Sequence, residues 1–140
     1  MGCLYVIWGS NLITLPVRIT DINYGNHLGH IQLIGLMHEA RLQVFHTWGL
    51  SETHCFGRAL VVRELSIRYS KESFYGDSLD FDIQLGVVKK CSFSLLYMIK
   101  RGCDTIATAS IELVCLDPNT RRIQSLPSQL LQSWNQKGLR

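Results

Sequence analysis

The side chains of this sequence best suited to chemistry lie in one loop, Asp21 to His30, where Asn23 and His27 are four residues apart and can point into one site. A carboxylate such as Asp21 can take a proton from water, whereas an amide can only orient water or donate a hydrogen bond. A neutral histidine can donate a hydrogen bond or position water. The loop therefore offers Asp21, Asn23 and His27 as candidate catalytic residues. The alternative is structural: Asn23 makes an Asx turn, and His27 packs beneath it.

A fourth candidate, Glu39, lies on the helix predicted to follow the loop. Over residues 30–48 apolar side chains recur three and four positions apart, in two adjacent stripes, which is typical of a buried helix. The polar positions form one narrow row with Glu39 at its centre: Gln32, Gly35, Glu39, Gln43 and His46. A single carboxylate among apolar neighbours would be partly desolvated, which makes it a better base. Alternatively, Glu39 lies on a solvated face or pairs with Arg41 or Arg63.

The start of this helix could also bind an anion. The Asp, Asn and Gly residues of the loop tolerate left-handed backbone and cap helices, so we expect the helix to begin near Gly29 and to end at Gly49. The backbone N–H groups of Leu28 and Gly29 are then expected to be unpaired and supported by the helix dipole, as an oxyanion requires. With the adjoining His30, they are the predicted substrate-binding residues at this end of the helix.

The remaining elements are predicted from alternating apolar residues. Five strands are predicted, one before the helix and four after it: residues 13–19, 64–69, 79–87, 91–99 and 107–115. Pro16 indicates an edge or strand-start position for the first strand. The links between the last four strands are too short for parallel crossovers, so these strands should pair antiparallel. A turn at 117–120 and a short helix at 127–136 complete the chain.

Length and composition indicate one domain, residues 1–140, because 140 residues with 46% hydrophobic side chains can fill a single core. Fourteen basic against eleven acidic residues leave a charge of +3, too weak to indicate a nucleic-acid partner. The longest apolar stretches have five residues, whereas about 20 are needed to cross a membrane, so no membrane segment is expected.

The cysteines and histidines give no sign of a metal site. The five cysteines are odd in number and contain no C-x-x-C pair, which fits a reducing compartment and a cytoplasmic location. Four histidines recur every eight residues, at 30, 38, 46 and 54, and this spacing drifts by about 80° per step around a helix, so they cannot converge on one ion. We therefore expect neither a metal nor a cofactor.

The segment from Asp21 to Arg41 resembles the signature of hotdog-fold thioesterases, in which an Asp-x-Asp/Asn loop runs through a histidine into a long central helix ending in Glu-Ala-Arg. Phe-Tyr-Gly-Asp-Ser-Leu at 74–79 resembles the Gly-Asp-x-Leu turn that opens a strand in the same superfamily. Together with the element order, the resemblance covers nearly the whole chain. It implies an α+β hotdog fold, in which a curled antiparallel sheet wraps around a long central helix. It also implies hydrolysis of an acyl thioester of coenzyme A or acyl carrier protein.

The resemblance assigns roles to several residues. The family places its catalytic carboxylate either two residues after the first Asp of the loop or on the central helix. The loop position here is Asn23, so Glu39 is left as the carboxylate that activates water, with Asp21 in reserve and with Asn23 and His27 orienting water or polarising the thioester. Lys89 and Lys90 could hold the phosphates of coenzyme A or an acidic carrier protein. Lysines at strand ends, however, also keep a sheet edge soluble.

A homodimer or a dimer of dimers is expected, because two curled sheets joined edge to edge would remove an exposed edge strand. The active site would then lie at the dimer interface. Two other functions stay open. The replacement of the loop carboxylate by Asn23 would suit a non-catalytic module that binds acyl-CoA or another acyl ligand. His27 and Glu39 could instead serve as the acid and base of a hydroxyacyl thioester dehydratase.

Overall fold

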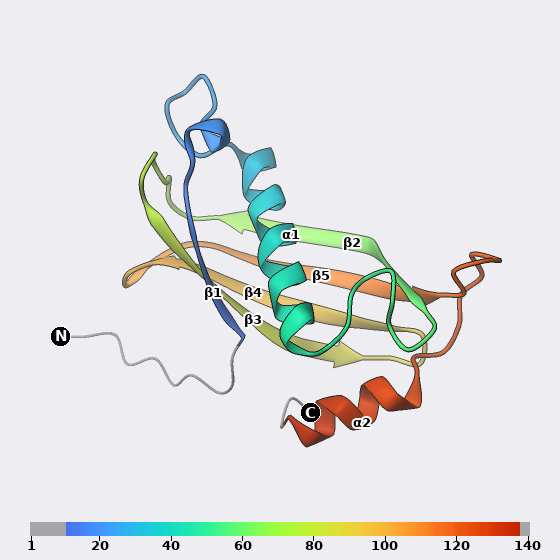
Figure 1. The fold of residues 1–140 in the computed structure, drawn as a ribbon. Helices are drawn as coiled ribbons and strands as arrows, with labels where there is room; N and C mark the ends of the chain where they lie inside the picture. The colour runs from blue at the N-terminus through green and yellow to red at the C-terminus, as the bar shows by residue number, and fades with distance from the viewer. Residues whose placement is uncertain (1–10, 138–140) are drawn as a thin grey trace.

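The computed structural model describes residues 11–137 and shows one curved sheet with a long helix lying across it (Figure 1). The elements in chain order are β1 (Leu12–Pro16), a 3-10 turn η1 (Ile19–Asp21), α1 (His30–Thr47), β2 (Ala59–Tyr69), β3 (Ser78–Val88), β4 (Ser92–Arg101), β5 (Asp104–Leu116) and α2 (Ser128–Gln136). All strand pairs are antiparallel, in the order β1-β3-β4-β5-β2. This confirms the predicted α+β class and the curled antiparallel sheet. None of the helices within residues 11–137 is long and apolar enough to span a bilayer.

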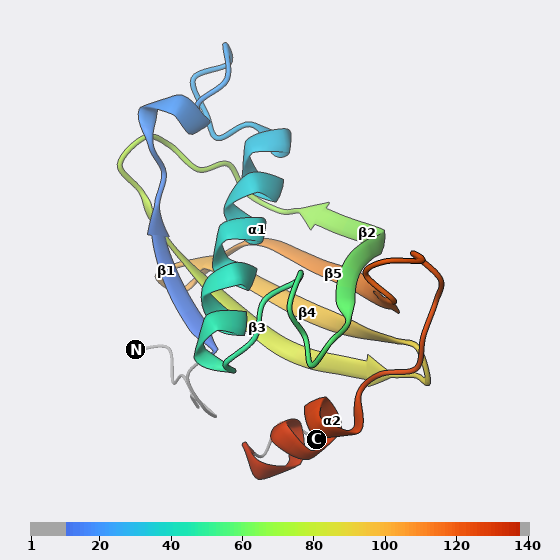
Figure 2. The ribbon, with the colours of Figure 1, turned by 45° about the vertical axis from the view of Figure 1, so that its right-hand side comes forward.

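Helix α1 begins and ends as its sequence predicts. Gly29 is the N-cap, and Gly49 follows the last turn with a φ of 77°, a left-handed conformation that glycine adopts without strain. The predicted polar row lies on the less buried side of the helix. The second apolar stripe is only partly buried, since Ile31 is 65% and Leu42 39% exposed. The expectation that α1 is covered nearly all round is therefore wrong for one chain, because the sheet covers only one side of the helix (Figure 2).

Two strand predictions missed their boundaries for identifiable reasons. The register of β2 against β5 shifts between Val62 and Glu64, and such a β-bulge interrupts the alternation of side chains. The periodic pattern is therefore recognisable only after the bulge, although β2 begins at Ala59. Strand β1 ends at Pro16, and the chain then turns into η1 instead of continuing to residue 19. Pro16 does lie on an edge strand, but at its end and not at its start.

An aromatic cluster closes one end of the core. Trp134 of α2 is fully buried and makes edge contacts with Phe93, at 4.9 Å between ring centroids, and with Trp48, at 6.2 Å. Phe45 packs against both Trp48 and Phe93. Helix α2 lies at the opposite end of the molecule from the 22–28 loop (Figure 1). The core is thus sealed at the α2 end, and any ligand site is expected at the loop end.

The edge strand β2 leaves apolar side chains uncovered. Leu65 pairs with Ile111 and Tyr69 pairs with Ala107, so Leu65 and Tyr69 lie on the inner face of the sheet with these two buried partners. Both remain more than one third exposed. Helix α1 packs on the same face against β1 and β3, toward the opposite edge of the sheet. The inner face beside β2 is therefore only partly covered within one chain.

Candidate active site

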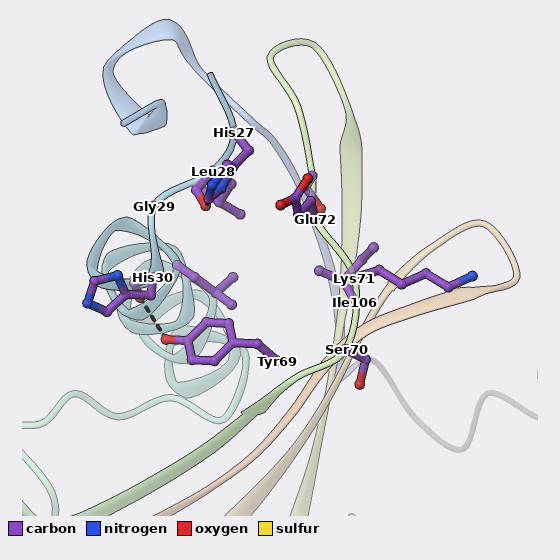
Figure 3. A pocket seen from close by; sticks show the side chains of 11 residues that line it. His27, Leu28, Gly29, His30, Tyr69, Ser70, Lys71, Glu72 and Ile106 are labelled. Atoms are coloured by element: carbon purple, nitrogen blue, oxygen red, sulfur yellow. Dashed lines mark hydrogen bonds between the residues drawn. The ribbon is translucent and has the colours of Figure 1, made fainter. Parts of the chain in front are cut away.

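A pocket of about 320 Å³ lies where the N-terminal end of α1 meets the end of β2 (Figure 3). Three buried apolar side chains, Leu28, Leu33 and Ile106, form part of its wall. The pocket is built from three separate segments of the chain, and its full lining is His27, Leu28, Gly29, His30, Leu33, Tyr69, Ser70, Lys71, Glu72, Ser73 and Ile106. An apolar pocket with a few polar groups at its edge is typical of a small-molecule site.

The structure brings together four of the residues predicted from the sequence, namely His27, Leu28, Gly29 and His30. His27 Nδ1 lies 3.0 Å from the carbonyl oxygen of Leu28. Because a carbonyl oxygen can only accept, this contact places the ring hydrogen of neutral His27 on Nδ1 and leaves a lone pair on Nε2. Neutral His27 therefore offers a proton acceptor at Nε2. In this tautomer Nε2 has no hydrogen to donate to the carbonyl of a thioester, so of the two predicted roles neutral His27 retains the positioning of water.

Asn23 is part of the turn that carries His27. Its side-chain oxygen accepts the N–H of Gly25 at 2.9 Å, and its own N–H donates to the carbonyl oxygen of His27 at 3.0 Å. This is the Asx turn that the sequence left as the alternative. A Cβ on Gly25 would lie 3.1 Å from His27 Nε2 and 3.2 Å from the Asn23 oxygen, so glycine lets the turn close against the histidine ring. Asn23 does not itself line the pocket.

The predicted oxyanion donors are already paired. The N–H of Leu28 donates to the carbonyl oxygen of Ser73 at 2.8 Å, and the N–H of Gly29 donates to that of Asp21 at 3.1 Å. The expectation that these two groups are unpaired is therefore wrong, because the segment after β2 and the start of the loop fold back onto them.

Free donors lie at the start of α1, from two residues further along the chain. The first hydrogen bond of the helix runs from the N–H of Leu33 to the carbonyl oxygen of Gly29. The N–H groups of His30, Ile31 and Gln32 have no hydrogen-bond partner among residues 11–137. Helical N–H groups point toward the N-terminus, which is the end of α1 that borders the pocket. These three groups are therefore the donors available to a negatively charged oxygen, and of the three residues His30 lines the pocket.

Asp21 has a structural role. Its carboxylate is buried and accepts hydrogen bonds from the backbone N–H of Arg18 at 2.8 Å and from the Arg18 guanidinium at 3.1 Å. The hydrogen bond to Asp21 is also the main reason that the pKa of Arg18 is raised. Asp21 thus closes the turn between β1 and the loop, and its carboxylate does not line the pocket.

Glu39 lies on another side of α1 from the pocket. Its carboxylate accepts a hydrogen bond from Gln43 at 2.8 Å and borders a second cavity, of about 430 Å³, with Pro16 and Arg18, beside β1. Ten residues of helix separate it from Gly29, which corresponds to about 15 Å along the axis. Within one chain the structure therefore does not bring Glu39 together with Asn23 or His27. Glu39 is exposed, so within one chain the alternative of a solvated face holds, and the expectation of a partly desolvated carboxylate does not.

The two basic residues suggested as partners of Glu39 are engaged elsewhere. Arg41 donates to Glu52 at 2.5 Å, and Arg63 pairs with Glu112. Coulombic attraction from Glu39 instead contributes a minor part of the raised pKa of Arg18.

The lysine pair predicted to bind phosphate lies far from the pocket of its own chain. Lys89 and Lys90 occupy the turn between β3 and β4, next to Ser92, which pairs with Val114 of β5. The pocket is lined by Ile106, near the other end of β5. At about 3.3 Å per residue, the turn is roughly 26 Å from the pocket along this strand. One chain alone therefore does not place these lysines at the site.

The end of β2 and the segment after it supply pocket residues that the sequence did not reveal. Tyr69 donates its hydroxyl hydrogen to the carbonyl oxygen of His30 at 2.9 Å (Figure 3). Glu72 lies across the pocket opening from His27 in the same view. Ser73 is 1% exposed, and its hydroxyl has no partner among the described residues. Alternation along β2 places Tyr69 on the inner face, but no sequence signal shows that it reaches the start of α1.

The fold and this pocket agree with a comparison against protein families. The model of the thioesterase-like superfamily matches residues 17–134. The chain belongs to this superfamily. The match runs from the end of β1 to Trp134 and so includes every residue that lines the pocket.

Two similar proteins are named for a thioester of coenzyme A, and a third has a structure in complex with CoA. The chain is 26% identical over 124 residues to a 1,4-dihydroxy-2-naphthoyl-CoA hydrolase from Synechococcus elongatus, which covers 86% of this chain and 90% of that protein. It has the fold of a 1,4-dihydroxy-2-naphthoyl-CoA thioesterase from Synechocystis (TM-score 0.77, 21% identity, 90% of this chain and 93% of that one). It also has the fold of a Staphylococcus aureus protein in complex with CoA (TM-score 0.84, 15% identity, 96% and 87% covered).

Proposed function

We propose that this thioesterase-superfamily protein hydrolyses an acyl-CoA thioester in the pocket at the start of α1. The observation that carries the proposal is that His27, whose Nε2 is a proton acceptor, and the start of α1, where backbone N–H groups are unpaired among the described residues, border one apolar pocket. Thioester hydrolysis needs both features, since water must lose a proton and the carbonyl oxygen becomes negatively charged. The Synechococcus relative, named as a CoA thioester hydrolase, supports this choice of substrate.

The reaction follows from the geometry. The acyl group lies against Leu28, Leu33 and Ile106, and its carbonyl oxygen accepts hydrogen bonds from the first turn of α1. His27 Nε2 takes a proton from water as the water oxygen bonds to the carbonyl carbon, and the resulting oxyanion is held by the same N–H groups. When the intermediate collapses, the carbon–sulfur bond breaks. His27 then returns the proton to the thiolate, which gives a free acid and coenzyme A.

Glu39 remains the second candidate base, on the strength of the family resemblance alone. The two assignments are separated by His27→Asn, whose amide can still donate to the Leu28 carbonyl but has no base at the Nε2 position, and by Glu39→Gln. We expect His27→Asn to lower kcat by about 10²- to 10⁴-fold, the usual contribution of a general base, and Glu39→Gln to stay within a few fold of wild type. The reverse pattern would assign the proton transfer to Glu39.

The acyl group we propose is compact and aromatic. The Synechococcus relative is named for a naphthoyl ester, and the fold is shared with a gentisyl-coenzyme A thioesterase. A volume of about 320 Å³ suits a ring system, and the buried side chains of Leu33 and Ile106 block extension into the core. Release of thiol from benzoyl-, naphthoyl-, octanoyl- and palmitoyl-CoA should favour the first two. Preference for palmitoyl-CoA would contradict this assignment.

A homodimer joined through β2 is part of the proposal. The uncovered Leu65 and Tyr69 support it, as does the free edge of β2. If β2 pairs antiparallel with β2 of a second chain, the start of the second chain's β2 lies beside the end of the first chain's β2. The β3–β4 turn of the copy, with Lys89 and Lys90, then comes toward the pocket and can hold the phosphates of coenzyme A. A dimer of dimers and a cytoplasmic location remain predictions from the sequence.

The two alternative functions, a dehydratase and a non-catalytic binding module, can be tested with the same purified protein. A dehydratase would need His27 and Glu39 on either side of one acyl group. Within one protein chain these two residues border different cavities. Hydration of an enoyl thioester without release of thiol would support it against hydrolysis. A non-catalytic binding module would retain acyl-CoA uncleaved through prolonged incubation.

A further inference from the structure

The hydroxyl of Tyr69 makes a contact that the hydrolysis mechanism does not use directly. It donates to the carbonyl oxygen of His30 at 2.9 Å, and the two rings meet edge to face with centroids 6.4 Å apart. Tyr69 is the last residue of β2, whereas His30 is the first residue of α1. This hydrogen bond therefore connects the exposed edge strand to the first turn of the helix (Figure 3).

The chemical consequence follows from the peptide bond. The carbonyl of His30 and the N–H of Ile31 belong to the same planar amide, whose electrons are delocalised. A hydrogen bond donated to the oxygen of an amide polarises the group and makes its N–H a stronger donor, by about 10–30% per bond in condensed phases. The N–H of Ile31 is one of the three groups at the start of α1 that have no partner among residues 11–137.

We propose that Tyr69 is a positioning residue for thioester hydrolysis: its hydroxyl orients and polarises the peptide group between His30 and Ile31, so that the N–H of Ile31 binds the oxyanion more strongly. This inference rests on the proposed function. It assigns to Tyr69 an effect on charge that develops in the transition state, and little effect on binding of the ground state.

Two further observations fit this role. Partial burial raises the pKa of Tyr69, so the phenol is protonated and able to donate at neutral pH. The neighbouring Ser73 lines the same pocket with a buried hydroxyl that has no partner among the described residues. A buried unpaired polar group is costly, so a polar ligand atom at this place would be favourable. The pocket wall next to Tyr69 is thus suited to a polar part of a substrate.

The test is Tyr69→Phe, which keeps the ring and removes only the hydroxyl. Complete loss of one oxyanion donor costs about 10²- to 10³-fold in kcat, so weakening of one donor should cost about 3- to 10-fold, with KM changed less than twofold. Tyr75→Phe is the matched control, because Tyr75 is 66% exposed and its hydroxyl makes no hydrogen bond within residues 11–137. Its kcat should equal that of wild type.

A spectroscopic measurement separates polarisation from a structural role. The probe is a benzoyl-CoA analogue in which CH₂ replaces the thioester sulfur, with ¹³C at the carbonyl, because this ketone cannot be hydrolysed. Its carbonyl band should shift to lower wavenumber on binding to wild type, and the shift should be smaller with Tyr69→Phe. An unchanged kcat in this variant overturns the inference, and so does a lowered kcat with an unchanged band. Absence of thioesterase activity in wild type overturns the proposed function instead, while the band still tests Tyr69.

Discussion

The buried indole of Trp134 provides a stability test in which the expected change in the free energy of unfolding is unusually small. Its side chain is fully buried between Phe93 and Trp48, yet its Nε1–H has no acceptor among residues 11–137. Trp134→Ala should cost about 3–5 kcal/mol, the usual range for a buried aromatic residue. Trp134→Phe removes part of the ring, at about 1–2 kcal/mol, but also removes an unpaired donor whose burial costs about 1–3 kcal/mol. The two terms nearly cancel, so Trp134→Phe should change the free energy of unfolding by less than about 1 kcal/mol.

The matched control is Trp48→Phe in the same cluster. The Nε1–H of Trp48 donates to the side-chain oxygen of the buried Asn11 at 3.4 Å, so this variant leaves an acceptor unpaired instead of removing an orphan donor. We expect it to cost about 2–3 kcal/mol. Urea unfolding followed by far-ultraviolet circular dichroism, at constant m, measures both variants. If Trp134→Phe is as costly as Trp48→Phe, the unpaired indole is not destabilising and the reasoning is refuted.

Three further predictions concern thiols, phosphate binding and assembly. Burial raises the pKa of Cys55 to about 12, so only a fraction of about 10⁻⁴ of this thiol is ionised at pH 8. Iodoacetamide should therefore modify Cys55, and likewise the buried Cys115, only after unfolding. Peptide mass mapping checks this. Lys89→Ala with Lys90→Ala should raise the KM for acyl-CoA several fold at low salt and make it less dependent on ionic strength; an unchanged salt dependence would remove these lysines from the site. Leu65→Arg puts a charge on the uncovered inner face beside β2 and should give a monomer with little activity by light scattering and thiol release, so a fully active monomer would argue against a shared site.

The sequence predicted the elements better than their contacts. Alternation and helical spacing report which side of an element is apolar, and this is a local property that survives folding. The register shift in β2 hides where that strand begins, because a bulge moves side chains to the other face. The pairing of the Leu28 N–H depends on Ser73, 45 residues away, and no local pattern encodes that contact. The oxyanion donors were accordingly expected two residues too early in the chain.

Glu39 shows where two kinds of inference diverge. Its apolar neighbours along the helix suggested a partly desolvated carboxylate, with a solvated face as the alternative, and within one chain the side chain is exposed. The family resemblance instead indicates a catalytic carboxylate, and nothing in the periodicity shows which edge of the sheet that face of the helix borders. His27 was recognisable as a candidate, but its tautomer depends on a contact with Leu28 that only coordinates reveal.

Leu33 and Ile106 belong both to the wall of the pocket and to the hydrophobic core. A substitution that shortens either side chain to admit a larger acyl group also leaves a cavity in the interior, at about 2–5 kcal/mol for a change to alanine. Such a loss is a large fraction of the 5–15 kcal/mol that keeps a typical domain folded. New substrate preferences should therefore evolve in this protein only after, or together with, stabilising changes elsewhere in the chain.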